Sequence, residues 1–112
     1  MKLRLCFTII LLLISTTTLA APTVRLVPGV GKFDLGLHAD ILEDPQGQLS
    51  IEQVSSSGYA EKWVQNQQAK PNFAFSDSVY WLRITLASEM QIPKNWLFEL
   101  AFALQDYIDY YV

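Results

Sequence analysis

The sequence predicts an all-β fold that contains one short helix. Three stretches, residues 79–87, 96–103 and 107–112, alternate in the manner of β-strands and are rich in aromatic and β-branched side chains. The only clear helix signal is short and lies upstream of all three stretches. Since successive strand side chains point to opposite faces, each stretch can bury one face when it pairs into a sheet.

The stretch 79–87 is the most informative, because it carries one arginine among apolar side chains. One of its faces is wholly apolar and consists of Tyr80, Leu82, Ile84 and Leu86. The other face consists of Val79, Trp81, Arg83 and Thr85. A charge in so apolar a strand needs a partner, which either the fold or a ligand must supply.

A hairpin with residues 96–103 offers Arg83 such a partner. One register sets Ile84 and Leu82 opposite apolar residues and sets Arg83 opposite Glu99. Opposite charges across two strands stabilise the pair, and a slip by one residue would turn every side chain to the wrong face. If the two strands lie in different sheets, Arg83 must find another acid.

The region before these strands combines extended and local signals. Residues 23–27 are predicted to be extended, and the alternation within 35–44 favours a second strand before a Pro-Gly turn at 45–48. Ser50 and Gln53 form a capping box, which predicts a helix over residues 51–54. Residues 59–70 are rich in glutamine and show no period, except that Trp63 is expected to pack inward.

The first twenty residues resemble a signal peptide. Lys2 and Arg4 precede an apolar run at 7–14, and small residues before Ala21 suit cleavage by signal peptidase. The run is too short to span a bilayer, although an uncleaved anchor is the alternative. The predicted organisation is therefore a signal peptide at 1–20, a lead segment at 21–34, and the N-terminal part of an exported domain at 35–112.

Composition excludes several classes of function. Cys6 is the only cysteine and lies in the predicted signal peptide, so the mature chain has neither a disulfide nor a thiol nucleophile. Without Lys2 and Arg4, six scattered basic residues stand against eleven acidic ones, which disfavours nucleic-acid binding.

Catalytic and metal signals are weak throughout. His38 is the only histidine, and it is expected to be a solvent-facing strand residue, so no histidine cluster for a metal exists. A phosphate loop at Gly31-Lys32 fails, because Leu26 and Phe33 replace residues that the motif needs. We therefore expect no enzyme activity in this segment, no cofactor and no metal.

An aromatic platform for a sugar is the most specific binding hypothesis. Trp81, Tyr107 and Tyr111 can present ring faces to a sugar, while Arg83 fixes hydroxyl groups. The candidate ligand-binding residues are thus Trp81, Arg83 and Tyr107. Packing in a core is the competing interpretation, because apolar residues at strand spacing usually pack.

Several runs resemble a known family in their order and spacing. They are Leu-Glu-Asp-Pro-Gln-Gly-Gln-Leu-Ser-Ile-Glu-Gln-Val at 42–54, Phe73 with Ser-Asp-Ser-Val-Tyr-Trp-Leu-Arg-Ile-Thr-Leu at 76–86, Trp-Leu-Phe-Glu-Leu at 96–100, and Asp-Tyr-Ile-Asp-Tyr-Tyr-Val at 106–112. The chain resembles the extracellular region, second type, of the bacterial seven-transmembrane receptors with diverse intracellular signalling modules. At position 74 the family usually has glycine, whereas this chain has Ala74.

The resemblance implies a jelly-roll-like β-sandwich similar to carbohydrate-binding modules, on the periplasmic face of the inner membrane of a Gram-negative bacterium. It also implies downstream membrane helices and an output such as a diguanylate cyclase or a histidine kinase. The ligand would be small, with carbohydrate as one class. Since the chain stops at Val112 inside a strand-like run, we expect an incomplete sandwich. The alternative function is a secreted stand-alone carbohydrate-binding module.

Overall fold

The computed structural model describes residues 19–101 and 107–112, so the predicted signal peptide lies outside it except for its last two residues. The elements, in chain order, are β1 (Val24–Leu26), η1 (Gly36–His38), β2 (Ala39–Asp44), α1 (Ile51–Val54), η2 (Ser57–Lys62), β3 (Val64–Gln65), β4 (Val79–Ile84) and β5 (Leu86–Ser88). No helix in these ranges has the length and apolar character needed to cross a membrane.

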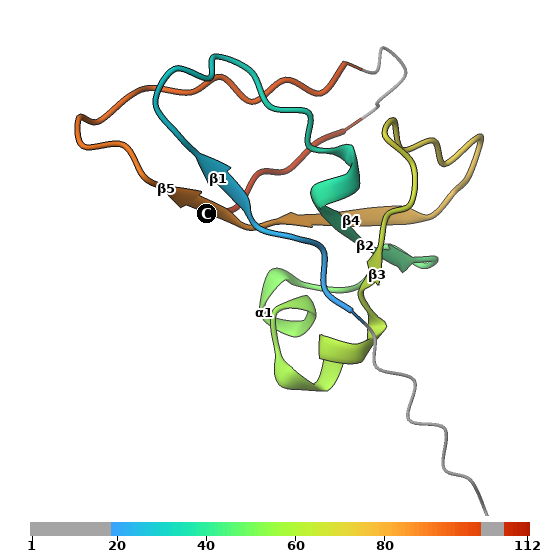
Figure 1. The fold of residues 1–112 in the computed structure, drawn as a ribbon. Helices are drawn as coiled ribbons and strands as arrows, with labels where there is room; N and C mark the ends of the chain where they lie inside the picture. Colours follow the sequence, from blue (N-terminus) through green and yellow to red (C-terminus); the bar gives the residue numbers. More distant parts are fainter. Residues whose placement is uncertain (1–18, 102–106) are drawn as a thin grey trace, which may run out of the picture.

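The strands form two sheets that share one extended run (Figure 1). One sheet is antiparallel in the order β3-β2-β4, and the other is the parallel pair β1-β5. Only Thr85 separates β4 from β5, and its carbonyl oxygen accepts a hydrogen bond of 2.9 Å from the backbone N–H of Val24. The predicted all-β character is confirmed in this coarse form, whereas the jelly-roll sandwich stays a prediction.

The predicted hairpin between β4 and residues 96–103 is wrong. β4 pairs with β2, in a register that runs from Ala39 opposite Ile84 to Asp44 opposite Val79. The described residues 96–101 and 107–112 form no strand, and 102–103 of the predicted partner lie outside the described part. The alternation that β4 needs is present in β2 as well, and β2 also places a carboxylate opposite the arginine.

The local predictions near the helix are confirmed. The Ser50 side chain accepts from the Gln53 backbone N–H (3.2 Å), and the Gln53 side chain accepts from the Ser50 backbone N–H (2.9 Å). Trp63 is buried, and its indole N–H donates to the carbonyl oxygen of Val54 at 3.0 Å. The predicted strand over 35–44 is shorter than expected, because η1 occupies its first part and ends at His38.

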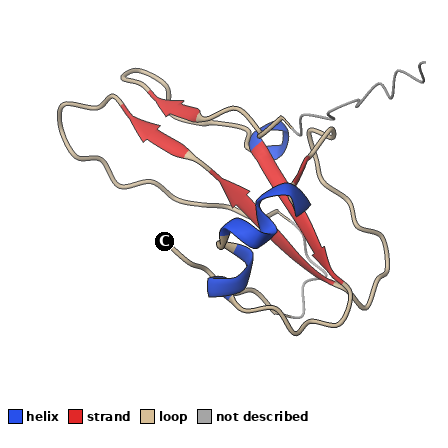
Figure 2. Cartoon of the chain, turned by 90° about the horizontal axis from the view of Figure 1, so that it is seen from below, coloured by secondary structure: helices blue, strands red, loops and turns tan. Residues whose placement is uncertain are grey.

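The core lies between the three-stranded sheet and the helical segments α1 and η2, which cross one face of that sheet (Figure 2). Its buried members are Leu42, Val54 and Trp63, with Leu49, Ile51, Tyr59 and Trp81 packed around them. The sheet face that they cover is therefore the one that carries Trp81 and Arg83. On the apolar face of β4, Tyr80 and Ile84 are half-buried and Leu82 is 40% exposed.

Candidate functional site

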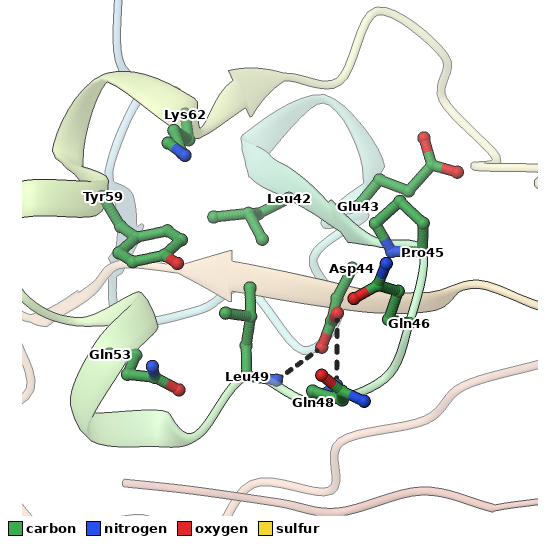
Figure 3. A pocket seen from close by; sticks show the side chains of 10 residues that line it. All are labelled: Leu42, Glu43, Asp44, Pro45, Gln46, Gln48, Leu49, Gln53, Tyr59 and Lys62. Carbon is green, nitrogen blue, oxygen red and sulfur yellow. Dashed lines mark hydrogen bonds between the residues drawn. The ribbon is translucent and has the colours of Figure 1, made fainter.

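The turn after β2 is built around the carboxylate of Asp44. Its oxygens accept the backbone N–H groups of Gln48 (3.3 Å) and Leu49 (3.0 Å), as Figure 3 shows. The Gly47 backbone N–H closes the turn onto the Asp44 carbonyl oxygen at 3.2 Å, with Gly47 in the left-handed region at φ 63°. Pro45 fits the second position of such a turn because its φ is fixed. Every residue of the Glu-Asp-Pro-x-Gly run from Asp44 onward thus serves the turn.

The pKa of the Asp44 carboxyl group lies below its ordinary value of 3.8. Burial raises this pKa, but the backbone N–H groups of Leu49, Gln48 and Gly47, together with the nearby Trp81 indole N–H, outweigh it. The Trp81 N–H is buried and has no acceptor at full hydrogen-bond geometry in the described part of the chain, so its influence on Asp44 is that of a nearby dipole.

Arg83 finds its partner in Asp40. The guanidinium donates twice to one carboxylate oxygen, through Nη2 at 2.9 Å and Nε at 3.3 Å. Its Cζ atom also lies 4.4 Å from the ring centroid of Trp63, which adds a cation–π contact. The Arg83 side chain is 42% exposed and that of Asp40 only 7%. The predicted pairing of Arg83 with Glu99 is therefore wrong. The acid that pairs with Arg83 is Asp40.

The three predicted ligand contacts are only partly brought together. Trp81 and Arg83 share one face of β4, and the Trp81 ring lies against the core cluster. The ring that stacks on Trp81 belongs to Tyr111, at 5.9 Å between centroids. Tyr107 is 78% exposed, and its hydroxyl donates to Asp109 at 2.9 Å, a bond that raises the Tyr107 pKa above 10.0. Binding through these residues stays a prediction.

Two open hollows lie beside β2, next to the part of its edge that the short strand β3 does not pair with. The first has a volume of about 430 Å³ and lies at the Asp44 turn, between Tyr59, Leu49 and Gln53 (Figure 3). The second has a volume of about 470 Å³ and extends over β3 and the segment that follows it. Glu43 and Lys62 line both hollows, so together they bring one negative and one positive charge.

The second hollow, here called the amide-lined hollow, combines amide side chains with an aromatic pair. Its lining includes Gln65, Gln67, Gln68, Asn72, Phe73 and Tyr80. The rings of Phe73 and Tyr80 stack at 4.0 Å between centroids, with 12° between their planes. Amides offer both donors and acceptors, and a stacked pair forms a flat apolar wall. This combination suits a small ligand that carries hydroxyl groups.

Sequence patterns missed this hollow, although a signal was present. Gln65, Asn66, Gln67 and Gln68 are consecutive, and this amide run fell in the stretch left unassigned. Asn66 itself is buried and holds the loop in place, because its amide donates to the carbonyl oxygens of Gly36 and Gln68. Among the described residues no group of three or more His, Cys, Asp or Glu side chains could hold a metal ion.

His38 takes a structural position instead of a solvent-facing place in a strand. It ends η1, and its Nδ1 lies 2.9 Å from the carbonyl oxygen of Pro22, to which it can donate. Asp40, two residues later, is occupied by Arg83. The His38 imidazole and the Asp40 carboxylate thus each have a different partner.

The chain matches the family "7TMR-DISM extracellular 2" over residues 36–112. It belongs to this family. This confirms the resemblance found in the sequence, and it identifies the chain as an exported, extracellular sensor domain of a membrane receptor. The family is one of extracellular sensor domains. No curated protein and no solved structure matches the chain.

The two most specific 7TMR-DISM motifs have structural roles in this domain. The Glu-Asp-Pro-x-Gly motif forms the Asp44 turn. The Tyr-Trp-Leu-Arg motif packs Trp81 against the core and places Arg83 in an ion pair with Asp40. Ala74, where the resemblance predicted glycine, has φ 52°, in the left-handed region that favours glycine. Both motifs therefore make contacts within the fold.

Proposed function

We propose that this sensor domain binds a small neutral ligand rich in hydroxyl groups, a carbohydrate, in the amide-lined hollow. The observation that carries the proposal is the run of amides from Gln65 to Gln68 beside the stacked rings of Phe73 and Tyr80. Sugar rings have apolar faces that pack on aromatic rings, while their hydroxyl groups need donors and acceptors in equal measure.

The charge around the hollow supports a neutral ligand. Lys62 and Glu43 both line it, and they bring opposite charges. The Glu43 carboxylate is engaged, since it accepts from the Ser78 hydroxyl at 2.8 Å and from the Tyr80 hydroxyl at 3.4 Å. An anionic ligand would want an excess of cations here, and the described residues around the hollow offer Lys62 alone.

In the whole receptor, ligand binding at this site is the input signal. The membership in the 7TMR-DISM family supports a location on the periplasmic face of the inner membrane of a Gram-negative bacterium. The same membership supports downstream membrane helices that pass the signal to an output such as a diguanylate cyclase or a histidine kinase.

A titration with a panel of neutral mono- and oligosaccharides tests the proposal, with affinity measured by calorimetry. Gln67→Ala and Phe73→Ala should each weaken binding about tenfold, which is the loss of one hydrogen bond or one ring contact. Gln91→Ala is the matched control, because Gln91 is an exposed glutamine outside both hollows. Affinity that survives both changes but is lost in Tyr107→Ala would place the ligand on the aromatic platform instead.

A further inference from the structure

The second oxygen of the Asp40 carboxylate has a partner of its own. While Oδ2 accepts from Arg83, Oδ1 accepts a hydrogen bond of 2.9 Å from the backbone nitrogen of Ala21. Asp40 is buried and Ala21 is half-buried, so this contact is shielded from water. It joins the N-terminal lead segment to the centre of the three-stranded sheet.

Ala21 is also the first residue after the predicted cleavage site. Hydrolysis of the Ala20–Ala21 peptide bond consumes one water molecule and leaves a carboxylate on Ala20, which departs with residues 1–20. The freed nitrogen of Ala21 becomes an amine and takes up a proton at neutral pH, because the ordinary pKa of an α-amino group is about 7.7–8.0. A neutral amide donor is thus replaced by a cation at the same atom.

We propose that removal of the signal peptide creates an ion pair between the Ala21 α-ammonium group and Asp40, which fastens the mature N-terminus to the sheet. The two cations do not compete, because each uses a different oxygen of Asp40. The carboxylate already makes the hydrogen bond from the amide a charge-assisted one, and the ammonium group adds the attraction between two opposite charges. Burial of Asp40 reduces the screening that makes exposed pairs weak.

The surrounding structure positions the new terminus for this role. The carbonyl oxygen of Pro22 lies 2.9 Å from Nδ1 of His38, which fixes the residue directly after Ala21. Val24 then begins β1 and pairs with β5. Contacts with His38 and β5 therefore hold residues 21–26 of the lead segment in place, and the ammonium group has little freedom to leave Asp40. Cleavage completes a contact for which the backbone is already placed.

The test compares the exported, processed chain with the same chain acetylated at its N-terminus by an N-terminal acetyltransferase. Mass spectrometry first establishes that the mature chain begins at Ala21. We expect acetylation to lower the melting temperature by about 5 °C, since a loss of this size in a small domain follows from one weakened charged hydrogen bond. In Asp40→Asn the free and the acetylated forms should have the same melting temperature, because the carboxylate is gone.

A second measurement applies if Asp40→Asn does not fold. The α-amine of Ala21 should react several-fold more slowly with an amine-specific aldehyde than the α-amine of a chain extended by Gly-Ser, because only the former is paired. Equal melting temperatures of the free and acetylated forms, or equal reaction rates, would overturn the proposal. A mature chain that begins at a residue other than Ala21 would overturn it as well.

Discussion

At the scale of single residues, Arg83 lies between two internal partners, the Asp40 carboxylate and the Trp63 ring. Arg83→Leu would leave a buried carboxylate without its guanidinium. Since an uncompensated buried charge is costly, we expect the free energy of unfolding to fall by about 2–3 kcal/mol, somewhat less than for a fully buried pair. Urea denaturation of the variant and the wild type measures this difference.

Arg25→Leu is the matched control for that experiment. Arg25 pairs with Glu89 at 3.2 Å, but the two side chains are 66% and 49% exposed. Exposed pairs contribute little, so the free energy of unfolding should change by less than about 0.5 kcal/mol. If Arg83→Leu instead kept full stability and lost ligand binding, Arg83 would be a ligand contact, as the sequence interpretation allowed.

Ala74 has a left-handed backbone although it is not glycine. Its φ of 52° lies in the left-handed region, where a Cβ atom costs about 1–2 kcal/mol and glycine has no such cost. Part of the gain in Ala74→Gly is lost to the entropy of the unfolded chain. We expect a net stabilisation of about 0.5–1 kcal/mol, measured as a higher urea midpoint.

Ala60→Gly serves as the opposite case, because Ala60 lies in η2, whose backbone is right-handed. There the same change removes a Cβ atom that costs nothing, and stability should fall by about 0.5–1 kcal/mol. Destabilisation by both substitutions would contradict a left-handed Ala74.

At the scale of elements, the Asp44 turn makes the stability of the domain depend on pH. Because the folded-state pKa of Asp44 is below its ordinary value of 3.8, its carboxylate stabilises the fold fully above pH 3.8. That contribution is lost as the pH falls through the lower, folded-state pKa. The wild type should therefore lose about 1 kcal/mol of stability in acid that Asp44→Asn, already weakened at neutral pH, does not lose.

Melting curves recorded from neutral pH down into acid measure this difference. Asp77→Asn is the control, since Asp77 is exposed and closes no turn onto backbone N–H groups. It should leave the shape of the acid profile as in the wild type. Parallel acid profiles for the wild type and Asp44→Asn would contradict the role assigned to the turn.

Elements whose contacts join residues close in the sequence were easier to predict than elements whose contacts join distant residues. The capping box of Ser50 and Gln53 acts across three residues, and the Asp44 turn acts across five, so local chemistry was enough to predict both. The partner of Arg83 lies 43 residues away, in β2. Two segments with similar alternation competed for β4, and periodicity alone does not rank them.

The site was harder to predict than the fold, because its residues carry no periodic signal. Glutamine is compatible with strand, loop and short helix alike, so the run from Gln65 to Gln68 gave no assignment. Aromatic residues drew attention to Trp81 and Tyr107, yet Trp81 lies at the core and Tyr107 is largely exposed. Phe73 stacks on Tyr80 across a segment in which Ala74 has a left-handed backbone, and the sequence pattern indicates neither feature.

At the scale of the whole molecule, η1 packs closely against the loop that forms one wall of the amide-lined hollow. A Cβ atom on Gly36 would collide with the backbone carbonyl of Ala69 and lie 3.1 Å from the carbonyl oxygen of Gln68. The Asn66 amide donates to the Gly36 carbonyl oxygen at 2.8 Å, and its backbone N–H donates to that of Ala39 at 2.9 Å. Stability and the shape of the hollow therefore depend on the same close approach.

Gly36→Ala should accordingly affect both properties at once. Because backbone atoms on the opposite side must move, we expect the free energy of unfolding to fall by about 1–3 kcal/mol. Sugar affinity should fall with it, since the displaced loop carries Gln68. In the control Gly31→Ala, a Cβ atom would meet nothing within 4 Å, so stability should stay within about 0.5 kcal/mol of the wild type. Unchanged stability in Gly36→Ala would contradict the close approach, while lost stability with full affinity at low temperature would separate the loop from ligand binding.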